Sequence, residues 1–400
     1  MVIIVGSGAG GAIIAYELAK ENIPVTIIEK GPYIDSKDAF KYYDTYNEDV
    51  DLLTTTCIGG ATIVSMSNMV KALDEELHDY GIDITNEYNY VEELIDVHPL
   101  DDSHIGKGTQ LFLDAGRKLG LNTLKMPKAI REEECIQCGK CAFGCPADAK
   151  WSGKDFVDKA VEKGAKLITE AEVIDVIVED SKVKGVKYIK NNKKESVLSD
   201  TVILSAGAIG TALILRHMGI DAGQNLFFDP FVSVGGYLKD INFNTEVQMA
   251  GLVVGKNFVL SPHFSSFIKG NSNGEIEDKD ILSIMVKTPD ESRGYVDDDG
   301  NVVKINTIQD IRYLAEGVAT AGFILEKCGV DPSTITSTVY RGAHPGGTAP
   351  IGKIVDSNQE TEIKGLFVSD ASVLPISPGK PPILTILALA KRLADYLINK

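Results

Sequence analysis

The stretch Met1–Gly31, MVIIVGSGAGGAIIAYELAKENIPVTIIEKG, decides the fold of this 400-residue chain. Its first apolar run, Val2–Val5, suits a buried parallel strand. Gly6, Gly8 and Gly11 then give the spacing G-x-G-x-x-G. In this motif the first glycine allows a tight turn, and the second lets the backbone approach a pyrophosphate. The third lets a helix lie close to the strand. The stretch therefore predicts a site for a dinucleotide.

The helix and strand that follow complete this unit. From Gly10 onward, apolar side chains form one helical face, and the free N–H groups at the helix start would point at phosphates. A second apolar strand, IPVTII, ends at Glu29, whose carboxylate would accept hydrogen bonds from ribose hydroxyls. Strand, turn, helix, strand and acid arrive in the expected order. The motif alone does not separate FAD from NAD.

Composition narrows the class of protein. With 40 Lys and Arg against 57 Asp and Glu, the net charge is −17, so neither nucleic acid nor an anionic membrane surface is an expected partner. The chain opens on a strand without a basic and apolar leader, and its longest apolar run, PPILTILALA, is too short to span a membrane. We therefore expect a cytoplasmic protein without a membrane span.

The C-terminal region favours FAD. The strand GLFVSD ends at Asp370, and a helix is predicted after SPGKPP. A second dinucleotide-facing segment so far along the chain is typical of flavoproteins in which FAD spans the domain.

Four stretches together resemble the glucose–methanol–choline (GMC) oxidoreductase family, which binds FAD and oxidises alcohols. They span the chain from end to end, so the resemblance concerns its whole architecture. Residues 70–130 and 225–335 match poorly, and the chain is short for the family, which suggests a trimmed substrate domain. The four stretches are the N-terminal glycine motif, CIGGATIVSMSNM (57–69), VILSAGAIGTALILRHMGI (202–220), and the block from HPGGTAPIG (344–352) through VSDASVLP to PPILTILALAKRLAD (381–395).

The resemblance implies a set of FAD contacts. No histidine follows the glycine pair in GGATIVS, so the flavin is expected to be bound non-covalently. The residues implied to bind FAD are Gly6, Gly8, Gly11, Glu29, Gly59, Gly60, Val173, Ala206, Asp370 and Pro382.

The middle of the chain predicts how the domains are assembled. A hairpin is expected around EDSKVKG (179–185), and DTVILSAGA (200–208) returns to the cofactor sheet. Alternating patterns in 230–310 suit an antiparallel sheet, and 305–329 predicts one long helix ending at Gly329. The predicted fold is α/β (α+β overall). It has a discontinuous Rossmann-like FAD-binding domain (1–70, 155–228 and 336–400), a helical and cysteine-loop insertion covering the flavin (71–154), and a smaller antiparallel-sheet substrate domain (229–335).

One histidine is the expected base. In the family, the histidine of the H-x-G-G-T-like motif takes the proton of the substrate hydroxyl, and here it is His344. The alternative is a histidine that only caps a turn beside Pro345. The family's second polar position, a histidine or asparagine, falls on Pro381, which has no side-chain donor or acceptor. Lys380 is the nearest replacement; otherwise one polar group suffices, or alcohol oxidation is not the reaction.

Four of the six cysteines lie in ECIQCGKCAFGCPADAKWS (134–152). Cys135, Cys138, Cys141 and Cys145, followed by Pro146, give the ferredoxin spacing C-x2-C-x2-C-x3-C-P, which predicts a [4Fe–4S] cluster. In two-cluster ferredoxins the last cysteine binds the other cluster, so Cys57 or Cys328 remains an alternative fourth ligand, as does a [3Fe–4S] cluster on three cysteines. A plain or disulfide-bonded loop over the flavin stays open, and so does zinc, although the spacing is tight for its tetrahedral site.

These features predict an FAD-dependent dehydrogenase. It would oxidise the CH–OH group of a small alcohol, polyol or sugar, and pass electrons through the cluster to a protein carrier such as ferredoxin. Two alternatives remain: a ferredoxin-linked flavin reductase of a carbonyl or C=C bond, and an electron-transfer subunit of a larger complex. His263 falls in the predicted substrate sheet and could line the pocket, although a structural role is its default.

Overall fold

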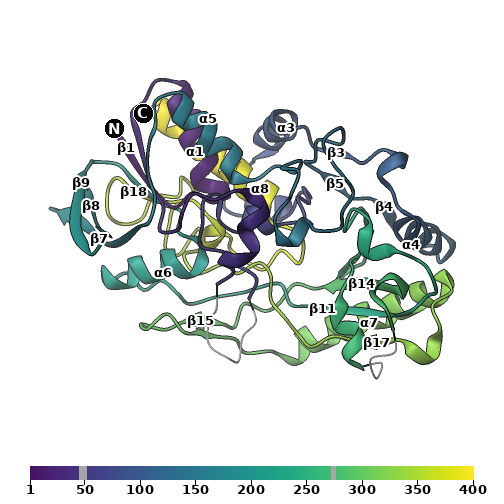
Figure 1. Cartoon of the computed structure of the whole chain (residues 1–400). Coiled ribbons are helices and arrows are strands. Elements are labelled where there is room, and N and C mark those ends of the chain that lie inside the picture. Colours follow the sequence, from purple (N-terminus) through teal and green to yellow (C-terminus); the bar gives the residue numbers. More distant parts are fainter. Residues whose placement is uncertain (45–51, 272–275) are drawn as a thin grey trace.

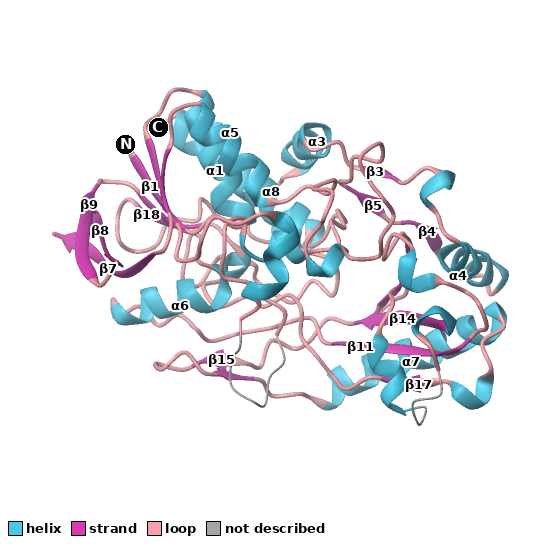
Figure 2. Cartoon of the chain, in the orientation of Figure 1, coloured by secondary structure: helices cyan, strands magenta, loops and turns pink. Residues whose placement is uncertain are grey.

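The computed structural model describes residues 1–44, 52–271 and 276–400. The predicted domain segments 1–70 and 229–335 each contain one of the two remaining stretches, 45–51 and 272–275, which lie outside the described residues. Two main sheets lie on opposite sides of the molecule with loops between them, as Figure 2 shows. No helix of the described part is long and apolar enough to cross a membrane.

A five-stranded parallel sheet gathers strands from both ends and the middle of the chain. The three strands β1, β10 and β18 are apolar throughout because a parallel sheet is covered on both faces. Ile4 of the first strand lies opposite Ile27 on one side and Ile203 on the other. The discontinuous cofactor sheet expected from the sequence is thus present. The strand order is β18 (Leu366–Val368), β10 (Val202–Leu204), β1 (Val2–Val5), β2 (Val25–Ile28) and β6 (Lys166–Ile168).

Helices and a small sheet surround the parallel sheet. α1 (Ala9–Lys20) packs against both α5 (Gly153–Glu162) and α8 (Ile383–Ile398), and the three form one layer in Figure 1. α3 (Thr85–Leu94) packs on α8, and the short α2 (Asp74–His78) precedes it. α6 (Gly207–His217) contacts β7 (Ala171–Glu179), which forms the expected hairpin with β8 (Lys182–Lys190); β9 (Lys193–Leu198) extends it.

A six-stranded antiparallel sheet forms the other half. It confirms the antiparallel pattern expected in 230–310. α7 (Ile308–Cys328), ended by Gly329 in the left-handed conformation (φ 88°), and α4 (Lys107–Lys118) cover one face. One strand of this sheet, β4, comes from the segment 71–154, which the sequence analysis assigned to a separate insertion. The domain boundaries therefore stay a prediction. The strand order is β17 (Thr336–Ser337), β11 (Phe231–Tyr237), β14 (Ile281–Lys287), β13 (Val259–Pro262), β12 (Gly251–Val254) and β4 (Thr123–Lys125).

Strand alternation in β14 decides which of its side chains face the space between the sheets. Leu282, Ile284 and Val286 join the hydrophobic core beneath α7. Met285 and Lys287 therefore point to the opposite side, toward the parallel sheet. Two small antiparallel pairs complete the fold. One joins β3 (His98–Pro99) to β5 (Pro127–Lys128), and the other joins β15 (Tyr295–Val296) to β16 (Val302–Val303).

Candidate active site

A cavity of about 980 Å³ opens between the two sheets. Its wall combines the glycine turn after β1, the end of β2, and parts of β7 and α6 with residues of β11 and β14. Eight of the ten predicted FAD-binding residues line it; Gly11 and Gly59 do not. A cavity of this size, open between a nucleotide-binding unit and a second sheet, is a natural place for a cofactor and substrate.

The glycine turn has the packing that its spacing predicts. Gly6 has a φ of 99°, and a Cβ added there would lie 2.2 Å from the Ser205 carbonyl oxygen. A Cβ at Gly11 would lie 2.4 Å from the carbonyl oxygen of Gly6. A Cβ at Gly8 would meet nothing within 4 Å, and Gly8 lines the cavity. The free space at Gly8, and the first amides of α1, which receive no side-chain cap, fit a phosphate group.

Glu29 lies buried at the end of β2. Its Oε2 accepts hydrogen bonds from the backbone N–H (3.0 Å) and hydroxyl (2.6 Å) of Ser7, and its Oε1 accepts one from the Gly31 N–H (2.7 Å). Burial raises the pKa of Glu29, and these three hydrogen bonds lower it again in part. Ser7 also accepts a bond from the N–H of Gly59 (3.0 Å), which places Gly59 behind the cavity wall.

Asp370 anchors the second dinucleotide-facing region. Its Oδ2 accepts hydrogen bonds from the Gly207 N–H (2.9 Å) and the Thr211 hydroxyl (2.6 Å), and its Oδ1 accepts one from the Ser372 N–H (2.8 Å). Burial raises the pKa of Asp370. The carboxylate therefore ties the start of α6 to the loop after β18. The remaining predicted contacts, Gly60, Val173, Ala206 and Pro382, lie on the cavity wall.

His344 and Asp229 form a hydrogen-bonded pair at the other end of the cavity. The His344 Nδ1 lies 2.9 Å from Oδ2 of Asp229, whose side chain is fully buried. Burial and the charge of Lys287 lower the pKa of His344 to about 4, although Asp229 acts in the opposite direction. In a neutral imidazole that donates from Nδ1 to a carboxylate, Nε2 carries the free lone pair. The lone pair is then available for a proton from a substrate.

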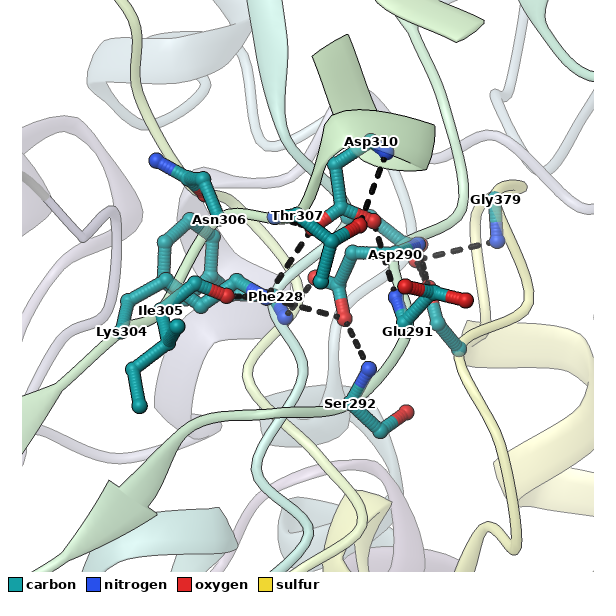
Figure 3. A network of polar contacts seen from close by, with 12 residues as sticks. Phe228, Asp290, Glu291, Ser292, Lys304, Ile305, Asn306, Thr307, Asp310 and Gly379 are labelled. Atoms are coloured by element: carbon teal, nitrogen blue, oxygen red, sulfur yellow. Dashed lines mark hydrogen bonds and ion pairs between the residues drawn. The ribbon is translucent and has the colours of Figure 1, made fainter. Parts of the chain in front are cut away.

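A buried network supports Asp229 from behind. Its Oδ1 accepts hydrogen bonds from the Ser377 hydroxyl (2.6 Å) and the Gly379 N–H (2.9 Å). Ser377 in turn accepts one from the N–H of Asp290 (2.9 Å). Lys304 lies between Asp290 and Asp310, with Nζ–O distances of 3.3 and 3.9 Å (Figure 3). The network fixes the carboxylate that orients His344.

Lys287 and His263 lie on the same part of the wall. Lys287 Nζ donates to the backbone carbonyl of Asp229 (3.3 Å), and burial lowers the pKa of this lysine to about 8. His263 Nδ1 lies 3.4 Å from the Ser233 hydroxyl oxygen. Burial first, and then Arg341 and Lys287, lower the pKa of His263 to about 4, so both cavity histidines are neutral at pH 7.

Lys380 does not join this group. It lines a separate depression of about 270 Å³ with Met69, Lys71 and Leu252. Pro381 borders both this depression and the large cavity. Lys380 is next to the family's second polar position in sequence. In the structure it lines the smaller depression and not the large cavity.

The cysteine loop borders the same cavity. Gly139, Ala142 and Phe143 line the wall, and the Tyr43 hydroxyl donates to the Ala142 carbonyl (2.6 Å). Cys135, Cys138, Cys141 and Cys145 are free thiols, which does not support the disulfide alternative. Over the described ranges, however, no three His, Cys, Asp or Glu side chains are grouped closely enough to hold a metal ion. Cys57 and Cys328 are buried elsewhere, the first against Gly31 and the second at the end of α7.

Two buried lysines lie beneath this loop. Lys128 Nζ donates to the Met66 carbonyl (2.8 Å) and the Asn68 side-chain oxygen (2.7 Å), and Lys150 Nζ donates to the Ile63 carbonyl (2.6 Å). Burial lowers the pKa of both, and the charge of Cys141 raises both. Positive groups thus lie between the cysteines and the segment 62–68 of the cavity wall.

Comparisons with known proteins agree with this geometry. Models for the GMC oxidoreductase family match residues 2–263 and 305–390. An uncharacterized protein of Methanocaldococcus jannaschii, MJ1450, is 33% identical, over 99% of each chain. Long-chain-alcohol oxidase FAO4B of Arabidopsis thaliana is 23% identical, over 100% of this chain and 68% of the oxidase. The crystal structure of pyridoxine 4-oxidase from Mesorbium loti superposes with a TM-score of 0.80 at 16% identity, over 100% of this chain and 99% of the other.

This chain belongs to the GMC oxidoreductase family, whose members are flavoenzymes that bind FAD and act on CH–OH donors. The resemblance drawn from its motifs is confirmed, and so is the α/β fold with a Rossmann-type half and an antiparallel sheet. Sequence reasoning missed Asp229 and Lys287. The available signals were an acid between apolar residues in FFDPF and the alternation of ILSIMVK, in which Lys287 shares a face with Met285.

Proposed function

We propose that this protein is an FAD-dependent dehydrogenase that oxidises a CH–OH group, with His344 as the base. The observation that carries the proposal is the 2.9 Å hydrogen bond between His344 Nδ1 and the buried Asp229 at the cavity wall. It orients an imidazole toward the cavity and fixes which of its nitrogens is protonated. Bound FAD would accept the hydride of the CH–OH carbon.

The same residues explain how the proton is handled. A His344 pKa of about 4 keeps the imidazole neutral at pH 7, so Nε2 can accept the hydroxyl proton. The imidazolium that forms is stabilised by the Asp229 carboxylate. Ser377 and Gly379 hold that carboxylate in place and Asp229 needs no rearrangement during the reaction. At the family's second polar position this chain has Pro381, which has no side-chain donor or acceptor.

The expected ADP-binding residues support the choice of cofactor. The open space at Gly8 and the uncapped start of α1 fit a pyrophosphate, and Glu29 lies where ribose hydroxyls are expected. The long-chain-alcohol oxidases among the relatives act, by their names, on alcohols, which supports a CH–OH substrate here. We retain the prediction of a cytoplasmic enzyme.

The test is anaerobic reduction of the bound flavin. Purified holoenzyme is mixed separately with alcohols, polyols and hydroxy acids. At least one of these compounds should reduce the flavin and so decrease its visible absorbance. His344→Ala should slow that bleaching by about 10²- to 10⁴-fold, the usual contribution of a general base, with FAD content unchanged. His78→Ala, at an exposed histidine of α2, is the matched control. Bleaching by reduced ferredoxin and by no CH–OH compound would instead favour the reductase alternative.

We also propose that Cys135, Cys138, Cys141 and Cys145 would hold a [4Fe–4S] cluster, which would supply one-electron transfer to a carrier such as ferredoxin. Three features support it: the ferredoxin spacing, the four free thiols on one loop beside the cavity, and the two buried lysines under that loop. Those lysines would offset the negative charge of a thiolate-bound cluster.

Metal analysis tests the cluster. Anaerobically purified protein should contain about four iron and four acid-labile sulfide per chain, with a paramagnetic signal after reduction. Cys138→Ala should abolish the signal, while Cys328→Ala, at a buried thiol of α7, should keep it. FAD without iron or sulfide in the wild-type protein would leave the loop as a cover for the flavin and would redirect the search for the electron acceptor.

A further inference from the structure

The cavity wall at the six-stranded sheet carries two cationic side chains, Lys287 and Arg341. Lys287 comes from β14, and Arg341 lies nearby with its guanidinium 4.2 Å from the centre of the Phe267 ring. His263 and His344, the two histidines beside them, both have pKa values depressed to about 4, burial being the largest cause and these cations a second one. In a chain with a net charge of −17, a pocket wall of this sign needs an explanation.

The carboxylates on the described part of the cavity wall lie on other elements. Glu29 and Asp370 follow strands of the parallel sheet, Glu172 lies on β7, and Asp299 lies in the β15–β16 turn. Asp44 accepts hydrogen bonds from Thr54 and Thr56. None of them belongs to the six-stranded sheet. At the substrate end, Lys287 and Arg341 accompany one carboxylate, Asp229, whose oxygens are engaged by His344, Ser377 and Gly379. The other acidic groups of the wall lie mainly where the nucleotide is expected.

Lys287 is built into this end and is not a surface side chain that folded inward. Only 5% of it is exposed. Its Cα pairs in register with Phe231 of β11 and Val259 of β13, which fixes the direction of the side chain. The ammonium lies 5.2 Å from the centre of the Phe231 ring. A buried ammonium has three N–H donors, which it must place on acceptors.

The three N–H donors of the Lys287 ammonium are only partly used by hydrogen bonds within the protein. Its one hydrogen bond among the described residues goes to the backbone carbonyl of Asp229 at 3.3 Å, and none of their ion pairs involves it. The Asp229 carboxylate is near enough to raise the pKa of Lys287, but burial outweighs it. Both carboxylate oxygens are already engaged, Oδ2 by His344 and Oδ1 by Ser377 and Gly379. Lys287 lines the cavity, so its remaining donors are available to a ligand bound there.

We propose that Lys287 binds an oxyanion of the substrate, so that the compound oxidised at His344 carries a carboxylate or phosphate beside its CH–OH group. The inference deepens the proposed function and rests on it for the reaction, though not for the binding of the anion. An ammonium and an oxyanion in a cavity of low dielectric form a strong, charge-assisted contact. The site thereby selects hydroxy acids or phosphorylated alcohols over neutral alcohols of the same size.

The shared anchor on Asp229 restricts the size of the substrate. Lys287 contacts the main-chain carbonyl of Asp229, and His344 contacts its side chain. The anion and the hydroxyl must therefore bind close to each other, with only a few bonds between them. A long-chain alcohol with a distant charged end does not meet this condition.

The first test needs no turnover. FAD-loaded enzyme is titrated with acetate and, separately, with inorganic phosphate, while flavin absorbance is followed. Saturable perturbation by one of them is expected, and the response identifies which oxyanion fits. Lys287→Met should weaken that binding at least tenfold, and Lys287→Arg should restore part of it. Lys256→Met, at an exposed lysine in the turn between β12 and β13, should bind like wild type. FAD content and melting temperature establish that each variant is folded.

The second test uses matched substrate pairs under anaerobic conditions. Flavin reduction is compared for lactate and methyl lactate, and for glycerol 3-phosphate and glycerol. The charged member of one pair should react at least tenfold faster, and Lys287→Met should remove the difference. If neutral alcohols reduce the flavin and oxyanions neither bind nor react preferentially, the inference is wrong and the proposed function stands. If oxyanions bind through Lys287 but no CH–OH compound reduces the flavin, the proposed function fails and the anion site remains.

Discussion

Lys304 and Lys287 are both buried lysines of the same half of the molecule, and the protein treats them differently. Lys304 lies over the Phe228 ring and between two carboxylates, Asp290 and Asp310. Lys287 lies over the Phe231 ring and has a single carbonyl at 3.3 Å. A buried charge that serves only the fold is paired, because an unpaired one is costly. The difference indicates that Lys287 is kept for a partner from outside the chain.

The largest effect is expected from removing the paired lysine. Lys304→Met leaves Asp290 and Asp310 buried without a cation, which should lower the free energy of unfolding by about 4 kcal/mol. Chemical denaturation of the holoenzyme, followed by circular dichroism, measures this loss. Lys256→Met, at an exposed lysine, is the control. A loss no larger than that of the control would mean that the network of Figure 3 does not stabilise the fold. Pairing would then not distinguish Lys304 from Lys287.

Removing the unpaired lysine should change how stability depends on pH. Burial lowers the pKa of Lys287 to about 8, against about 10.4 in an unfolded chain. Between these values the unfolded chain still holds the proton that the folded protein has released, so stability rises with pH, by about 3 kcal/mol in total.

Lys287→Met lacks this contribution. The unfolding free energy of wild type, relative to the variant, should therefore increase from pH 8 to pH 10 in parallel denaturation series. Lys128, whose pKa is also lowered to about 8, is present in both proteins and cancels. A difference that does not vary with pH would show that the Lys287 ammonium is not held in a buried site.

Asp229 connects the two lysine regions, and its substitution separates their roles. Asp229→Asn keeps the shape but allows an amide N–H to face His344 Nδ1, which favours the imidazole tautomer with its proton on Nε2. Flavin reduction by the best substrate should slow about 100-fold, equivalent to about 2.7 kcal/mol, without loss of FAD. Asp290→Asn disturbs the Lys304 side instead and should lower stability more than rate. Equal rate losses in the two variants would contradict a special role for Asp229.

Much of the fold was readable from local patterns. The units β1–α1–β2, β11, β13, β14 and α7 each carry their own periodicity, which is set by burial on one or both faces. β4, β9 and β12 were missed. β4 owes its place to pairing with β12, a distant segment, and β9 is almost wholly exposed, with no apolar face to reveal it.

The candidate site was predictable only in part, for a related reason. The glycine motif and His344 belong to recognisable local sequences. Asp229 acquires its role only by contact with His344 across 115 residues. Lys380 shows the opposite case, since this residue is next to Pro381 in sequence but lines a different depression. Short-range patterns identify elements, whereas the chemistry arises where separate elements meet.

The close contact at Gly10 has a consequence for how the enzyme is made. A Cβ there would lie 1.9 Å from the carbonyl oxygen of Ser369, and Ser205 donates a hydrogen bond to the same oxygen (2.8 Å). The turn nearest the start of the chain is thus completed by residues near its end. A nascent chain on the ribosome has made its phosphate-binding turn long before the residues that close it emerge. We therefore expect flavin binding only after β18 has been synthesised, and chains that stop before β18 should lack part of the cofactor pocket.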